Sequence, residues 1–217
     1  MSESSSAHGE VPPLKKGDHY HHPDLREAMI RVAQELLESE GPSGWTVRAA
    51  ARIAGVSSGA PYRHFADKDT LLAAVAARGF DELLAEVQSK LEKVDGTPGA
   101  RLEAAAEAYL TFALSRPGRY QVMFGREIAN RKLHPGLCEA ADRALEAMAN
   151  EVQRAQNAGF LRSDRSAQLI AAGAWSVLHG LSDLLLSGRL GEEGQGDPMA
   201  LTRTIGRMVF QGVAARS

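Results

Sequence analysis

The stretch that decides the fold is residues 46–72, TVRAAARIAGVSSGAPYRHFADKDTLL. Its first part repeats apolar residues at helical spacing: Val47, Ala50, Ala51 and Ala54. Thr46 can cap this helix through its hydroxyl, and Gly55 stands where a helix end favours a residue that tolerates positive φ. The next residues, SSGAPYRHF, predict a second short helix capped by Ser57 or Ser58, and Asp67 predicts the cap of a third.

Two helices joined by a glycine-containing turn form a helix-turn-helix, whose second helix enters the major groove of DNA. Gly59 and Pro61 are poor residues in a helix interior, but a first turn tolerates them. Pro61 also biases Ala60 away from helical angles, so the helix can begin as late as Pro61. Small residues here allow the backbone close to base edges, and three longer side chains can reach phosphates: Tyr62, Arg63 and His64.

The pattern VSSGAPYRHFADKDTLL, preceded by an amphipathic helix and by TVRAAARIAG, resembles the TetR family of bacterial transcriptional regulators. It departs from the family at Ala60–Pro61, where most members carry Thr or Ser and then an aliphatic residue. The resemblance implies a set of DNA-binding residues: Thr46, Val47, Arg48, Ser57, Ser58, Gly59, Ala60, Pro61, Tyr62, Arg63, His64 and Lys68. The alternative is a helical hairpin that binds no nucleic acid.

The composition of the 217 residues favours an all-α protein, because Ala, Leu, Glu and Arg are plentiful and β-branched runs are absent. The net charge is −2, yet residues 41–80 carry five basic side chains against two acidic ones. A locally basic head on an acidic body fits a modest contact with DNA. We expect an N-terminal three-helix helix-turn-helix head, a larger C-terminal helical bundle and about nine helices in total.

We expect three segments along the chain. Residues 1–21 form a disordered N-terminal arm, residues 22–68 the helix-turn-helix DNA-binding domain, and residues 69–217 the ligand-binding and dimerisation domain. Histidines in the arm lack nearby cysteines and helical spacing, so we expect no metal there. Pro and Gly breaks predict the body helices at residues 67–93, 100–115, 120–124, 135–158, 164–187 and 197–215.

The helix predicted at residues 164–187 is apolar almost all round and carries small residues, including Gly173 and Gly180. The TetR family forms a four-helix dimer interface from the last two helices of each protomer, and this composition suits that role. A homodimer also matches a palindromic operator, whose half-sites lie about one helical turn apart. The alternative is burial of this helix within a single chain.

The stretches AWSVLHG and RPGRYQVMF resemble a TetR subgroup whose regulatory body carries a Trp…His-Gly signature. Apolar walls with a few polar tips predict a pocket for a small-molecule effector. Its expected lining is Tyr109, Phe112, Tyr120, Met123, Phe124, Met148, Trp175 and His179. The alternative is a packed core in which His179 bonds to a backbone carbonyl.

The leading interpretation is a sequence-specific, DNA-binding transcriptional regulator, most simply a small-molecule-responsive repressor. A helical-bundle enzyme using His134, His179 and Asp183 is the second, because His179 and Asp183 are four residues apart and can pair. No nucleophile, metal cluster or phosphate loop accompanies them, so we expect no enzymatic activity, catalytic residue, metal or cofactor. A protein-binding adaptor that does not bind DNA is the third.

Cys138 is the only cysteine, which excludes an intrachain disulfide and favours a reducing cytoplasm. We interpret it as a buried structural thiol. No run reaches about 18 consecutive apolar residues, and the N-terminus lacks the apolar region of a signal peptide. We therefore expect a cytoplasmic protein without a membrane partner.

Overall fold

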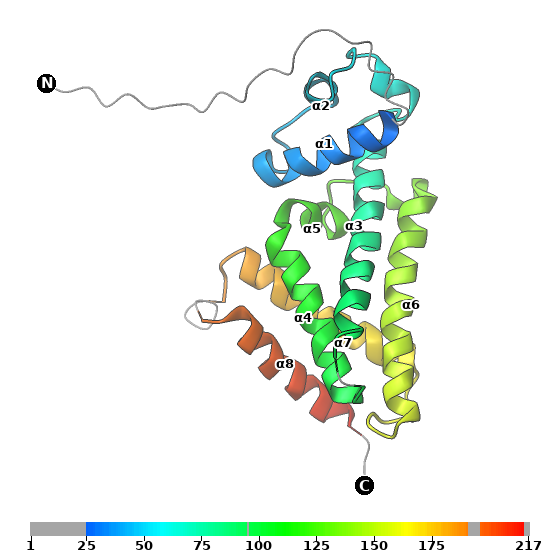
Figure 1. Cartoon of the computed structure of the whole chain (residues 1–217), viewed down its shortest axis with the longest axis vertical. Helices are drawn as coiled ribbons and strands as arrows, with labels where there is room; N and C mark the ends of the chain where they lie inside the picture. Colours follow the sequence, from blue (N-terminus) through cyan, green and yellow to red (C-terminus); the bar gives the residue numbers. More distant parts are fainter. Residues whose placement is uncertain (1–24, 95, 191–195, 215–217) are drawn as a thin grey trace, which may run out of the picture.

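The computed structural model describes residues 25–94, 96–190 and 196–214. The described helices are α1 (Leu25–Glu40), α2 (Val47–Ile53), the 3₁₀ helix η1 (Ala60–Arg63), α3 (Lys68–Leu91), α4 (Pro98–Ser115), α5 (Pro117–Phe124), the 3₁₀ helix η2 (Arg131–Leu133), α6 (Pro135–Asn157), α7 (Ala167–Leu186) and α8 (Pro198–Val213). Figure 1 shows α1 and α2 at one end and the remaining α-helices in an elongated body. The predicted all-α architecture is confirmed. The predicted arm lies outside the described residues.

Local sequence signals set the limits of the head helices. The Thr46 hydroxyl accepts a hydrogen bond from the backbone N–H of Ala49 at 3.1 Å, and the Asp67 carboxylate accepts one from Thr70 at 2.7 Å. Both side chains satisfy free N–H groups of a first turn. Gly55 follows α2 with a φ of +73°, a conformation that L side chains rarely adopt. These three predictions from the sequence are confirmed.

The second helix of the motif differs from the prediction. Instead of an α-helix over SSGAPYRHF, the chain forms one 3₁₀ turn, η1, and no side chain caps it. The N–H of Tyr62 bonds to the Gly59 carbonyl at 3.3 Å, and the N–H of His64 to the Pro61 carbonyl at 2.9 Å. Pro61 has no N–H to donate and disfavours α-helical angles at Ala60, which is the physical reason for the short element.

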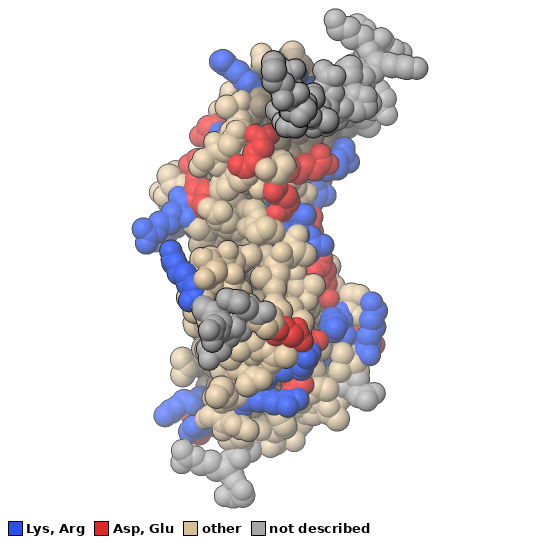
Figure 2. All heavy atoms as spheres, turned by 90° about the vertical axis from the view of Figure 1, so that its left-hand side faces the viewer, with Lys and Arg blue, Asp and Glu red and all other residues tan. Residues whose placement is uncertain are grey.

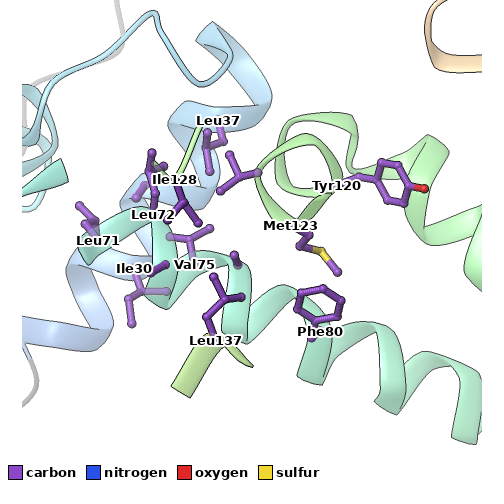
Figure 3. Close-up of a cluster of buried hydrophobic side chains, with 14 of the residues drawn as sticks. Ile30, Leu37, Leu71, Leu72, Val75, Phe80, Tyr120, Met123, Ile128 and Leu137 are labelled. Atoms are coloured by element: carbon purple, nitrogen blue, oxygen red, sulfur yellow. The ribbon is translucent and has the colours of Figure 1, made fainter. Parts of the chain in front are cut away.

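One cluster of buried apolar side chains joins the head to the body (Figure 3). It contains Leu37 of α1, Val75 and Phe80 of α3, and Met123 of α5. Burial of one such side chain contributes about 1.5–3 kcal/mol, so the cluster holds these helices firmly together. α3 therefore runs from the head into the body through a shared core. The predicted boundary between residues 68 and 69 does not separate two cores, and it stays a prediction.

A polar joint reinforces this connection where α1 meets α5. The Glu38 carboxylate accepts hydrogen bonds from the backbone N–H groups of Gly118 at 2.9 Å and Arg119 at 3.1 Å. It thereby caps the first turn of α5 from another helix. The Arg119 guanidinium also bonds to Glu38 at 3.0 Å and to Glu82 of α3 at 2.7 Å. Three helices thus meet at three charged residues, one from each helix.

The body is built around α3, which packs against α4, α5 and α6. α7 lies against α4 and α6, and α8 covers α4 on the outside, as Figure 1 shows. The predicted bounds of these helices lie within a few residues of the observed ones, because most of the helices begin or end at or near a Pro or Gly residue. The chain also closes on itself where the N–H of Arg162 bonds to the Val213 carbonyl at 2.9 Å.

Candidate DNA-binding head and body cavity

The outward surface of the head surrounds η1. Most residues of the predicted DNA-binding set lie on it and are exposed: Thr46, Arg48, Ser57, Ser58, Gly59, Tyr62, Arg63 and His64. Ala60 is half-buried. Tyr62 is 48% exposed, which is unusual for a tyrosine in a packed fold. A Cβ added at Gly59 would meet nothing within 4 Å, so the chain itself does not crowd this turn.

The charge on this surface is positive and uncompensated. Among the described residues, Arg48, Arg52 and Arg63 form no ion pair, whereas most arginines of the body do. The nearby carboxylates are occupied elsewhere, because Asp67 caps α3 and Asp69 accepts from the backbone N–H of Ala129 at 3.3 Å. Hydrogen bonds from Thr70 hold the pKa of Asp67 below its usual range. The head therefore offers free guanidinium groups to an anionic partner.

Three residues of the predicted DNA-binding set contact other parts of the head instead of facing outward. Val47 is 4% exposed and Pro61 is buried, so their side chains pack inside the head. The Lys68 ammonium donates to the carbonyl oxygens of Pro42 at 2.8 Å and Trp45 at 2.7 Å. It also lies 4.4 Å from the centroid of the Trp45 ring, and burial lowers its pKa. Lys68 closes the loop before α2, a role that its sequence position does not reveal.

The body contains a cavity of about 400 Å³ between α3, α4, α6 and α7. Of the predicted pocket residues, Tyr109, Phe124, Met148 and Trp175 line it. The other four do not: Phe112, Tyr120, Met123 and His179. The sequence prediction missed most of the α3 wall, because an apolar stripe on a long helix is also the mark of ordinary core packing: Phe80, Leu83, Leu84, Val87 and Leu91.

A chain of hydrogen bonds links four of the predicted pocket residues. The Trp175 indole N–H donates to the Tyr109 hydroxyl at 3.1 Å, and the hydroxyls of Tyr109 and Tyr120 lie 3.0 Å apart. The Tyr120 hydroxyl lies 2.7 Å from Nδ1 of His179. His179 thus pairs with a side chain, not with the backbone carbonyl of the packed-core alternative.

Burial keeps the side chains in this series of hydrogen bonds uncharged. It raises the pKa of the Tyr109 and Tyr120 hydroxyls well above their usual range. It also lowers the pKa of His179, against the opposing pull of the nearby Asp183 carboxylate. All these groups are therefore neutral near pH 7, and the polar lining next to the cavity acts through hydrogen bonds alone.

The three residues of the enzyme alternative are not brought together. His134 precedes α6 and lies near Asp67 at the head end of α3. His179 lies near Asp183 on α7, but its ring contacts those of Tyr120 and Phe124 of α5. Within the described residues, no group of three or more His, Cys, Asp or Glu side chains could hold a metal ion. The geometry gives no support to a site made from His134, His179 and Asp183.

Comparison with known proteins covers both parts of the chain. Residues 29–75 match the model of the bacterial regulatory proteins of the tetR family. Residues 102–208 match the model of the tetracyclin repressor-like C-terminal domain. The chain belongs to the TetR family. It is a DNA-binding transcriptional regulator.

This TetR-family regulator is similar, among others, to two solved structures and to one relative matched by sequence. A solved structure from Rhodococcus sp. RHA1, a protein with unknown function, is 31% identical, covers 91% of this chain and 100% of its own, and has a TM-score of 0.80. A putative tetR family regulator from Shewanella sp. PV-4 is 20% identical over 88% of this chain and 98% of its own, with a TM-score of 0.65. The nucleoid occlusion factor SlmA of Marinobacter nauticus is 25% identical over 69% of this chain and 75% of its own.

The TetR-family body leaves one apolar helix largely uncovered. α7 has 20 residues and a mean hydropathy of 1.5, and 22% of its most apolar window is buried. By length and composition alone it could cross a membrane, but core helices of soluble proteins pass the same test, so α7 does not indicate a membrane protein. Several of its apolar side chains are exposed, as is one on α8: Leu169, Val177, Leu184, Leu186 and Met208.

Proposed function

We propose that this TetR-family regulator is a homodimeric repressor whose heads bind a palindromic operator and whose body cavity binds a small-molecule effector. The observation that carries the proposal is the free, positively charged surface around η1. Its small residues let the backbone approach base edges, while Arg48, Arg63, Tyr62 and His64 contact phosphates. In this arrangement, the phosphate contacts made by α2 and η1 position the head on the duplex. The proposed domains remain residues 22–68 for the head and 69–217 for the body.

The uncovered face of α7 and α8 supports the homodimer. Exposed leucines on α7 accompany Gly173 and Gly180, where an added Cβ would meet nothing within 4 Å. Small residues beside large apolar ones let the same helices of a second copy approach closely. Figure 2 looks onto the side of the molecule where α8 lies and shows mostly uncharged residues over the body there. Two α7–α8 pairs would bury this face in a four-helix interface.

The position of α3 supports control by a ligand. This helix begins beside the head at Lys68 and then forms one wall of the cavity from Phe80 to Leu91. A ligand that displaces this wall also changes the tilt of the head. Operator affinity falls only as far as the ligand prefers the displaced state. DNA is a cytoplasmic partner in bacteria, so we place the protein in the cytoplasm.

The test is a mobility shift with operator DNA selected from genomic fragments, repeated at several salt concentrations. We expect Arg63→Ala to weaken binding and to reduce the slope of log affinity against log salt by about two, because each of the two heads of the dimer loses one phosphate contact. Arg165→Ala is the matched control, because Arg165 is exposed in the body and far along the chain from the head. Equal binding by Arg63→Ala and the wild type would remove η1 from the interface. A protein that bound no DNA but formed a stable hetero-complex would favour the adaptor.

A further inference from the structure

The cavity is long and has an aromatic inner end. Its wall on α3 extends from Phe80 to Leu91, twelve residues that span about 16.5 Å at 1.5 Å per residue. At the end nearer the head, the ring centroids of Phe80 and Phe124 lie 5.2 Å apart, and those of Phe124 and Trp175 lie 5.8 Å apart. Rings at these separations form a continuous apolar surface. A molecule that fills this space is therefore elongated.

The charged side chains that line the cavity are either paired or at its edge. The two carboxylate oxygens of Glu151 each accept a hydrogen bond from Arg101 at 2.9 Å. Asp142 and Arg154 of α6 are exposed, as is Gln88 of α3, so the cavity meets solvent along the seam between α3 and α6. Of the charged lining residues in the described part of the chain, Glu151 pairs with Arg101, Arg154 pairs with Glu151, and Asp142 is exposed to solvent.

At the aromatic end of the cavity, the neutral hydroxyl of Tyr109 is the group that can form a hydrogen bond with a ligand. Tyr109 lines the cavity, and its hydroxyl accepts a hydrogen bond from Trp175 and shares a second one with the Tyr120 hydroxyl. These two bonds leave the Tyr109 hydroxyl with either one lone pair or its proton for a further partner. A hydroxyl or carbonyl oxygen finds a match there. An ionised group does not, because burying a charge without a counter-charge costs far more than burying a neutral polar group.

We propose that the effector is an uncharged, elongated, largely apolar molecule, such as a long-chain alcohol or ester, that lies along α3 with its oxygen at Tyr109. This inference rests on the proposed function of the cavity as the effector site. It separates the effector from the acids and amines of the same chain length, which carry a full charge at neutral pH.

The test uses four probes of one chain length: 1-decanol, methyl decanoate, decanoate and decylammonium. Each is titrated into the full-length protein at neutral pH, with calorimetry and tryptophan fluorescence as readouts. We expect the two neutral probes to bind at least about tenfold more tightly than either ion. Trp175→Phe should remove the fluorescence change, because Trp175 lines the cavity and Trp45 lies in the head. Equal or tighter binding of either ion would overturn the proposal.

A pair of variants places the probe in this cavity. Val87→Phe puts a ring into the open space, whereas Ala85→Phe puts one on the exposed side of the same helix. We expect the first to weaken 1-decanol binding about tenfold or more and the second to leave it unchanged. Unchanged binding by Val87→Phe would overturn the assignment of the site.

The DNA mobility shift separates this inference from the proposed function. If the protein binds operator DNA but none of the neutral probes, the proposed effector class is wrong and the regulator stands. If it binds the neutral probes without losing any affinity for its operator, the effector class stands and the ligand control is wrong. Neutral probes that bind and release the DNA support both.

Discussion

At the scale of single residues, Gly118 lies where α5 of the body closely approaches α1 of the head. A Cβ at this position would lie 2.2 Å from the backbone carbonyl oxygen of Leu37. Backbone atoms cannot rotate away as a side chain can, so α1 and α5 would have to separate. The helices come this close only because residue 118 has no side chain.

Gly118→Ala should therefore lower the free energy of unfolding by about 1–3 kcal/mol, the usual cost of overpacking. Gly136→Ala is the control, because an added Cβ there meets nothing within 4 Å. Gly136 lies in α6, where alanine replaces glycine without loss. Denaturant unfolding of both variants measures the difference. Equal unfolding free energies for the two variants would show that α1 and α5 can separate without loss of stability.

His179 predicts a dependence of stability on pH. Burial lowers its pKa below the ordinary value of 6.5, so the folded protein binds fewer protons than the unfolded chain below that pH. Its contribution to stability is complete above pH 6.5 and is lost as the pH falls through the lower folded value. Thermal unfolding at about pH 7.5 and 5.5 should show a smaller decrease for His179→Gln than for the wild type. Parallel decreases would contradict this account.

At the scale of elements, much of the fold could be predicted because the signals are local. Thr46, Asp67 and Gly55 act within one turn of their own position, and proline and glycine mark most body helices. The length of η1 was missed because Pro61 and Gly59 weaken the α-helix by an amount that only the packed head decides. The Glu38 cap on α5 was also missed, since its partners lie eighty residues away in sequence.

The residues of the candidate sites also divide into those that local sequence signals predict and those whose roles depend on contacts between distant segments. Exposed residues of the head follow from the motif, whereas the inward roles of Lys68, Val47 and Pro61 depend on contacts with other segments. In the body, helical spacing identifies the residues that face inward. It cannot tell which inward face meets a cavity and which meets another side chain, as Met123 meets Gly79.

Gly59 tests whether η1 serves binding or folding. Its φ of −90° suits any residue, and an added Cβ meets nothing within 4 Å, so Gly59→Ala should leave the unfolding free energy unchanged or slightly raised. Operator affinity should nevertheless fall by about tenfold, because the methyl group keeps the backbone from base edges. A variant that binds DNA normally would show that the backbone does not approach the groove at this point.

At the scale of the whole molecule, the uncovered face of α7 and α8 predicts the assembly state. Leu184→Glu places a charge on this face and should convert the proposed dimer into monomers, because a buried unpaired carboxylate costs several kcal/mol. Gln153→Glu is the control on the exposed side of α6. Analytical ultracentrifugation over a range of concentrations measures both. A wild-type chain that stays monomeric at every concentration would end the proposal of a dimer.

The uncovered face of α7 and α8 has a consequence for gene regulation in the cell. On the proposed assembly, only paired copies present two heads to an operator, and at low abundance their number grows roughly with the square of the copy number. A small rise in synthesis then produces a disproportionate rise in occupied promoters. The regulator would switch its target genes at a threshold set by its own expression, even before any effector enters the cell.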